Sequence, residues 1–159
     1  MPDFGYMSKQ DLNAMVRILP RIATKVITAA ATSLTTGLSP VTLFTVQGLV
    51  LARVFAAVPT AITSTGGTGT IAVGVTGNTG ALLAATTADG TNFPTGSVWA
   101  GDTSPTVKAE VFSAAALNWA PVYNTNIIAT IATNSMTAGA ITFYCEYKLL
   151  DQNALVIPA

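Results

Sequence analysis

The residues able to do chemistry in this sequence are few, and their types exclude most kinds of active site. The chain of 159 residues contains no histidine and one cysteine, Cys145. Without histidine it lacks the usual base that activates a serine or cysteine nucleophile, and also the commonest metal ligand. A zinc site needs about four ligands, so cysteine and histidine cannot build one here. We expect Cys145 to fill the core as a small hydrophobic residue.

The carboxylates of residues 54–159 are dispersed along the chain: Asp89, Asp102, Glu110, Glu146 and Asp151. Two carboxylates that meet in the fold can act as a glycosidase-type pair, but this spacing does not indicate one. Asp89 and Asp102 lie in turns that contain glycine, and the loop pattern of an EF-hand is missing. Side-chain contacts to the turn backbone are therefore expected there instead of Ca²⁺ binding. The sequence predicts no enzyme activity, no catalytic residue, no metal ion and no cofactor.

Residues 67–72 (GTGTIA) fit a relaxed form of the dinucleotide-binding fingerprint. That motif requires a strand before it, a helix after it and a βαβ unit. Here a valine-rich segment typical of a strand follows, so we interpret these glycines as the approach to a hairpin.

Aromatic residues gather between positions 93 and 123, and they allow two interpretations. Trp99, Trp119 and Tyr123 could form a platform on which a sugar ring stacks. Alternatively they belong to the core and to a protein interface, which the prolines in the same region favour because they place aromatic residues in loops.

The segment from Ala140 to Leu149 has the clearest secondary-structure pattern in the sequence. Its apolar residues alternate with polar ones at period two, which is typical of a strand with one dry face and one wet face. We expect it to be a central strand, with Cys145 on its dry face. In Leu49–Ala57 both alternating faces are largely apolar, which predicts a strand covered on both sides.

Similar patterns, separated by Gly, Pro, Asn and Asp, predict further short strands. The expected strands are Thr24–Ala29, Val41–Gln47, Leu49–Ala57, Thr70–Val75, Gly80–Thr86, Gly96–Trp99, Thr106–Phe112, Asn126–Thr133, Ala140–Leu149 and Ala154–Ile157. Tight turns are expected at Gly77-Asn78 and Asp89-Gly90. The predicted fold class is all-β, a jelly-roll-like β-sandwich of about eight to ten strands.

The first residues have a different pattern, so we divide the chain into residues 1–21 and a sandwich domain of residues 22–159. Pro2 and Gly5 predict an extended arm, and a short helix follows from Ser8 to about Leu19, where Pro20 ends it. Apolar residues and arginines of this front segment are candidates for an interface: Phe4, Tyr6, Leu12, Met15, Arg17, Leu19 and Arg21.

Composition predicts a protein that associates. Half of the residues are hydrophobic, 9% are charged, and the formal net charge is zero. A chain with so few charges is expected to have much of its surface covered by other chains. No window approaches the roughly 18 apolar residues of a membrane helix. Residues 1–53 carry five Lys or Arg and two Asp, which is too weak a basic cluster to predict nucleic-acid binding.

The body of the chain resembles small structural proteins of tailed-bacteriophage virions. The resemblance lies in residues 69–84 (GTIAVGVTGNTGALLA), 127–133 (IIATIAT) and 137–150 (TAGAITFYCEYKLL), and it spans roughly residues 40–150. It implies a decoration or cement protein, made in the host cytoplasm, that binds the major capsid protein on the exterior of the virion. It also implies a homo-oligomer, either a dimer or a trimer. A tail or connector component and a carbohydrate-binding module remain the alternatives.

Overall fold

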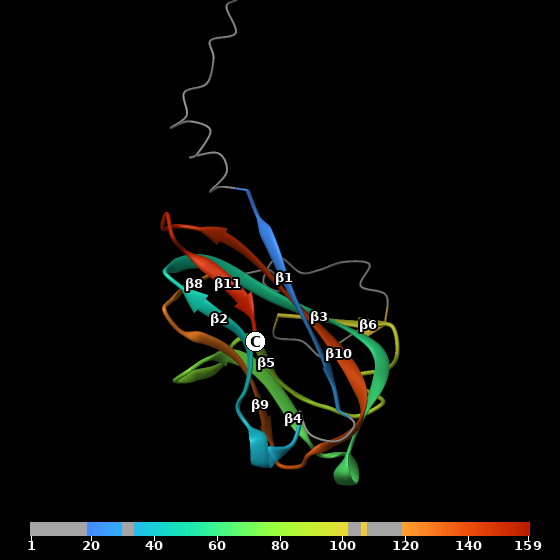
Figure 1. The fold of residues 1–159 in the computed structure, drawn as a ribbon. Coiled ribbons are helices and arrows are strands. Elements are labelled where there is room, and N and C mark those ends of the chain that lie inside the picture. Colours follow the sequence, from blue (N-terminus) through green and yellow to red (C-terminus); the bar gives the residue numbers. More distant parts are fainter. Residues whose placement is uncertain (1–18, 30–33, 102–105, 108–118) are drawn as a thin grey trace, which may run out of the picture.

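The computed structural model describes residues 19–29, 34–101, 106–107 and 119–159 of the chain. These residues form two antiparallel β-sheets, called A and B here, packed face to face as a β-sandwich. The helical elements described are two 3-10 turns, η1 (Thr36–Leu38) and η2 (Thr65–Gly67). Figure 1 shows the strands of the two sheets stacked around a common interior. The predicted all-β sandwich is therefore confirmed, while its jelly-roll topology stays a prediction.

Sheet A contains six strands. Its order is β1 (Arg21–Thr28), β10 (Met136–Leu149), β3 (Leu49–Ser64), β6 (Ser97–Ala100) and β7 (Thr106–Val107). The short strand β8 (Ala120–Tyr123) pairs with the first residues of β3, while β6 pairs farther along the same strand. Because β10 lies between β1 and β3, the segment expected to be central is an interior strand of its sheet.

Sheet B contains five strands, in the order β11, β2, β9, β4 and β5. Their bounds are β11 (Leu155–Pro158), β2 (Val41–Gln47), β9 (Asn126–Ala132), β4 (Thr70–Val75) and β5 (Asn78–Thr87). The turn from β4 to β5 passes through Gly77, whose φ of 88° is accessible to glycine at little cost. The tight turn predicted at this position is confirmed.

The core lies between the two sheets and follows the alternation of the sequence. Along β10 every second residue from Ile141 to Leu149 is buried, and the residues between them are half-buried. Burial of alternate residues makes β10 the strand with one dry face that the pattern predicted. The largest fully buried side chains come from both sheets and from the segments before η1 and before β6: Trp99, Phe44, Phe93, Phe143, Leu34, Leu43, Ile62, Ile71, Leu83, Ile127, Ile141 and Val50.

Several strand predictions need correction, and β10 itself begins at Met136, four residues before the expected Ala140. The strand expected to end at Ala57 continues to Ser64, because a register shift between the Ala57–Thr142 and Thr60–Ala140 pairs accommodates Pro59. Strand β8 was not predicted, because it is four residues long and contains Pro121. The first strand begins at Arg21, three residues earlier than expected, so the sandwich includes that residue.

The two faces of β3 differ in their burial. Val50, Ala52, Val54 and Ala56 are buried in the core, whereas the residues between them are half-buried. The predicted cover is confirmed for the inner face, while cover of the outer face by another chain stays a prediction. Its outer face stays partly accessible despite its apolar composition.

Candidate functional site

Cys145 lies in the core, as predicted, and has no environment that would activate it. Its side chain is fully buried on the inner face of β10. Burial, followed by the negative charge of Glu146, raises the pKa of the thiol from 9.0 to about 12. A thiol with such a pKa carries almost no thiolate at neutral pH, so it is a poor nucleophile and a poor metal ligand.

The described carboxylates each have a structural partner. Asp89 Oδ1 accepts hydrogen bonds from the backbone N–H groups of Thr91 and Asn92 at 2.9 and 2.7 Å, which confirms the turn contact expected at this position. Asp151 Oδ2 accepts from the N–H of Leu49 at 2.8 Å. Glu146 pairs with an arginine, as described below. Within the described ranges, no three Cys, Asp or Glu side chains are grouped to hold a metal ion.

The glycines at positions 67–69 lead into a strand. Residue 67 ends η2, and β4 begins at Thr70 and pairs with β5 and β9. The N–H of Gly69 donates to Ser64 Oγ at 3.2 Å, so it is satisfied within the chain. A dinucleotide site would need a helix where β4 lies, so our interpretation of this segment as a hairpin is confirmed.

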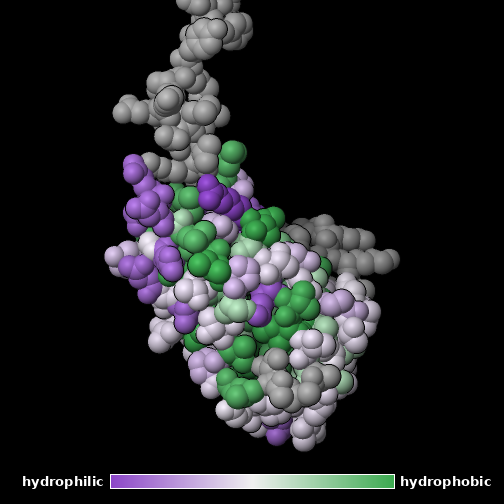
Figure 2. Space-filling model, in the orientation of Figure 1, coloured by the Kyte–Doolittle hydropathy of each residue, from purple (hydrophilic) through white to green (hydrophobic). Residues whose placement is uncertain are grey.

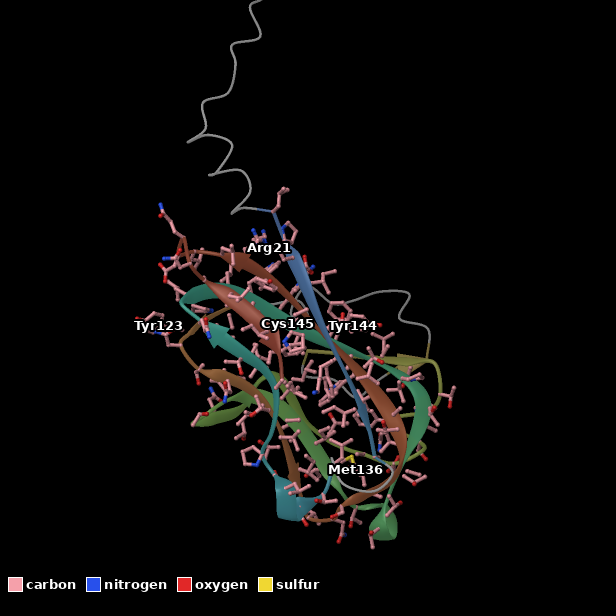
Figure 3. The ribbon with its side chains drawn as sticks, viewed as in Figure 1. Arg21, Tyr123, Met136, Tyr144 and Cys145 are labelled. Carbon is pink, nitrogen blue, oxygen red and sulfur yellow. The ribbon has the colours of Figure 1, made fainter. Side chains whose placement is uncertain are left out.

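The three residues of the predicted sugar platform do not lie together on the surface. Trp99 is fully buried and packs edge-on against Phe93, with ring centroids 5.2 Å apart. Its assignment to a platform is wrong, because β6 points this residue into the core. Tyr123 is 62% exposed at the end of β8, and Trp119 is half-buried immediately before β8. Figure 3 shows Tyr123 projecting from the margin of the sandwich, away from the labelled residues of β10.

Trp119 belongs to a row of side chains that crosses the outer face of sheet A. The strand register places Glu146 opposite both Ile22 and Arg53. Extending the β3–β8 register by one residue places Trp119 opposite Arg53. Three strand positions and Trp119, just before β8, thus form one transverse row with the exposed Ile22 at one end and the tryptophan at the other.

Charge and aromatic contacts hold this row in place. Arg53 Nη2 and Nε both contact Glu146 Oε2, at 2.5 and 2.7 Å. The Arg53 guanidinium carbon and Lys148 Nζ each lie 4.8 Å from the centre of the Trp119 ring, a distance at which a cation is attracted by the aromatic face. The tryptophan is therefore engaged by two cations of its own chain.

The neighbouring row is aromatic. Thr24, Tyr144 and Phe55 lie side by side on β1, β10 and β3. The rings of Phe55 and Tyr144 stack with centroids 5.0 Å apart and an angle of 13° between their planes. The outer face of sheet A is thus a half-buried apolar and aromatic surface with one ion pair and one further lysine. The alternation of Leu49, Leu51, Arg53 and Phe55 predicted a covered outer face on β3, but these residues were not named as a site and the contributions of β1, β10 and Trp119 were missed.

Exposed hydrophobic residues gather at one side of the sandwich. Large hydrophobic side chains are exposed at Leu19, Ile22, Val26, Leu38, Leu155 and Ile157, which lie in or beside β1, η1 and β11. Figure 2 shows hydrophobic residues running along β1 and its surroundings. Of the predicted front-segment interface, Leu19 is 58% exposed and Arg21 opens β1 opposite Tyr147. The other five residues, Phe4, Tyr6, Leu12, Met15 and Arg17, lie outside the described residues, as does most of the predicted helix.

Comparison of the chain with protein-family models, with curated proteins and with solved structures gave no significant match. Among the described residues, no helix has the length and apolar character that crossing a membrane would require.

Proposed function

We propose that this protein is a structural component of a tailed-phage virion, of the decoration or cement type. It would bind the major capsid protein on the capsid exterior and associate with its own copies. The observation that supports this proposal best is the apolar outer face of sheet A, which continues into the exposed side chains of Ile22 and Val26. A surface of this kind, on a chain with 9% charged residues, favours burial against another protein.

The proposed mechanism is repeated burial of a modest surface. Each copy gains very roughly 25 cal/mol per Å² of apolar area removed from water, before the costs of ordering and association. A capsid lattice offers many equivalent sites, so copies that also contact one another are retained through avidity. In this proposal Phe4, Tyr6, Leu12, Met15 and Leu19 supply apolar contacts of the front segment. Arg17 and Arg21 pair with acidic groups of a neighbour.

The experiment that tests the proposal is co-sedimentation of the purified chain with capsids that lack it. We expect saturable binding and improved survival of the capsids on heating. Replacing Phe55 and Tyr144 together by serine should weaken binding, whereas Tyr123→Ser, at the margin of the sheet, is the matched control. A chain that stays in the supernatant at all concentrations would overturn the capsid role. Binding to isolated tails instead would favour a tail or connector component.

A carbohydrate-binding module is the second candidate, and the exposed ring of Tyr123 is the observation that favours it. Two observations weaken this candidate. Trp99 is buried and cannot contact a sugar, and Arg53 and Lys148 already lie over the Trp119 ring. Glycan-array binding that Tyr123→Ala abolishes would favour this function over the capsid role.

A further inference from the structure

The strand β1 is an edge strand whose second side is open among the described residues. It pairs with β10 over all eight residues, from Arg21 opposite Tyr147 to Thr28 opposite Ala140, without a register shift. In the same register, the N–H of Ala29 donates to the backbone oxygen of Gly139 at 2.8 Å. Hydrogen-bonded positions alternate in an antiparallel pair, so the odd-numbered residues of β1 bond to β10. The backbone groups of Ile22, Thr24, Val26 and Thr28 therefore point to the free edge.

Of the features that normally prevent pairing, this edge carries one, the inward-pointing charge of Lys25. Natural edge strands are protected by prolines, bulges and charged side chains, including charges that point inward. Here Pro20 lies before β1, the pairing has no bulge, and Arg21 is at the strand end. Lys25 is on the inward side, and its ammonium group donates to the backbone oxygen of Ala159, after β11. That contact directs the lysine charge toward sheet B.

The side chains on the open strand are spaced symmetrically. Ile22 and Val26 are 62% and 59% exposed on the outer face, and each lies two residues from Thr24. We propose that two copies of this chain pair β1 with β1 in antiparallel orientation, about a twofold axis at Thr24. Ile22 then lies opposite the partner's Val26, Thr24 lies opposite the partner's Thr24, and the two A sheets become one continuous sheet.

Neighbouring registers would also use the free backbone groups, and they are less favourable; an axis at Ala23, for example, places Arg21 opposite the partner's Lys25. An axis at Lys25 places it opposite the partner's Lys25, and like charges directly opposite each other destabilise a strand pair. An axis at Val26 pairs only residues 24–28 and leaves Ile22 without an apolar neighbour. With the axis at Thr24, Lys25 faces the partner's Ala23 and Arg21 faces the partner's Ile27. No like charges are opposed, and residues 21–27 of each strand are paired.

A second copy fits this edge because the strand is complementary to itself, as an isologous interface requires. Seven paired residues span about 24 Å at roughly 3.4 Å per residue. Strand pairing alone covers less than the roughly 800 Å² per partner of a standard interface. Leu155 and Ile157 of β11, a strand that contacts β1, add exposed apolar side chains to this side of the sandwich.

The test is the solution mass of the full chain by light scattering, over a concentration series and without capsids. We expect a dimer. Thr24→Pro should raise the dimer dissociation constant by roughly tenfold or more, because it removes both central hydrogen bonds but no bond to β10. Thr24→Val keeps the N–H and is the matched control, while circular dichroism shows whether both variants fold. A monomer at all concentrations, or a folded Thr24→Pro variant that dimerises like the control, would overturn the proposal.

Cysteine cross-linking tests the register. Thr24→Cys should form an intermolecular disulfide under mild oxidation, because directly opposed residues of a hydrogen-bonded pair have Cα atoms about 5.5 Å apart. Thr28→Cys is the control, since the two copies of residue 28 would be about 27 Å apart along the strands. Equal cross-linking of both variants, or faster cross-linking by Val26→Cys, would overturn the Thr24 axis.

The inference deepens the proposed self-association, but its test is independent of the capsid role. A chain that dimerises through β1 and ignores capsids would contradict the proposed function alone. A monomer that co-sediments with capsids would contradict the β1 dimer alone.

Discussion

Arg53 on β3 and Glu146 on β10 lie directly opposite each other on the outer face of sheet A, joined at a single carboxylate oxygen. Their side chains are 25% and 15% exposed, so the pair is neither fully solvated nor fully buried. Fully exposed pairs contribute at most about 1 kcal/mol, whereas breaking a buried pair costs about 3–5 kcal/mol. This pair is expected to lie between these limits.

We predict that Arg53→Met or Glu146→Gln lowers the free energy of unfolding by about 1–2 kcal/mol, because each leaves one half-buried charge unpaired. The measurement is urea unfolding of both single variants and the double variant. The double variant should be more stable than the sum of the single losses implies. Lys148→Met, which removes the other cation over Trp119, is the control. Purely additive losses in the cycle would contradict a direct interaction.

How far the sequence predicts this fold depends on the residues concerned. Strands β2 and β4 have the predicted bounds, and the alternating core of β10 was recognised, because period two is a local property. Pairing between distant strands leaves no such local signal. The opposition of Arg53 and Glu146 depends on the register of segments 93 residues apart, so it could not be placed from the pattern alone.

Trp99 shows a different limit of sequence reasoning. A tryptophan in a short strand has the same local pattern whether it points to solvent or to the core. Its direction is set by the pairing of β6 with β3, which places Trp99 opposite the buried Ala56. The aromatic cluster in the sequence therefore separates into a core part and a surface part.

We predict that the two tryptophans differ in their access to solvent. In Trp119→Phe, the fluorescence of the remaining Trp99 should be blue-shifted and several-fold less quenched by acrylamide than that of the unmodified chain. The reason is that Trp99 is fully buried while Trp119 is half-buried. Quenching in the presence of urea serves as the unfolded reference. If Trp99 were quenched as readily as in urea, its place in the core would be wrong.

Gly139 is expected to be irreplaceable within β10. Its φ is 108°, and a Cβ atom would lie 2.8 Å from Ile62 Cα and still closer to the backbone oxygen of Ala61. Gly139→Ala should therefore cost about 2–3 kcal/mol, from backbone strain and from the displacement of β3. For a domain of this size, this loss lowers Tm by roughly 4–12 °C.

Gly80→Ala on β5 is the control for that substitution. Its nearest atom would be Ala84 Cα at 4.0 Å, and its φ is not in the left-handed region. Its Tm should stay close to that of the unmodified chain. Equal Tm values for the two variants would show that the bulged start of β10 can relax around a side chain.

We predict that the buried Cys145 thiol lowers the free energy of unfolding at alkaline pH. Its pKa is about 12 in the folded chain, against an ordinary value of 9.0. Above about pH 9 the unfolded thiol loses its proton while the folded thiol keeps it, so the unfolded state binds fewer protons. The contribution of this thiol is thus fully present below pH 9 and is lost progressively as pH rises toward 12. The slope approaches about 1.4 kcal/mol per pH unit.

The measurement compares the free energy of unfolding between pH 7 and 11 for the unmodified chain and for Cys145→Ala. All other residues are the same in both proteins, so the difference between the two curves isolates the thiol. We expect Cys145→Ala to lose less stability as pH rises. The native thiol should also react with a disulfide reagent at pH 8 only as fast as the chain opens, because the buried sulfur carries almost no thiolate. Parallel pH curves together with rapid native labelling would place Cys145 at the surface, and the inner face of β10 would then be assigned to the wrong side.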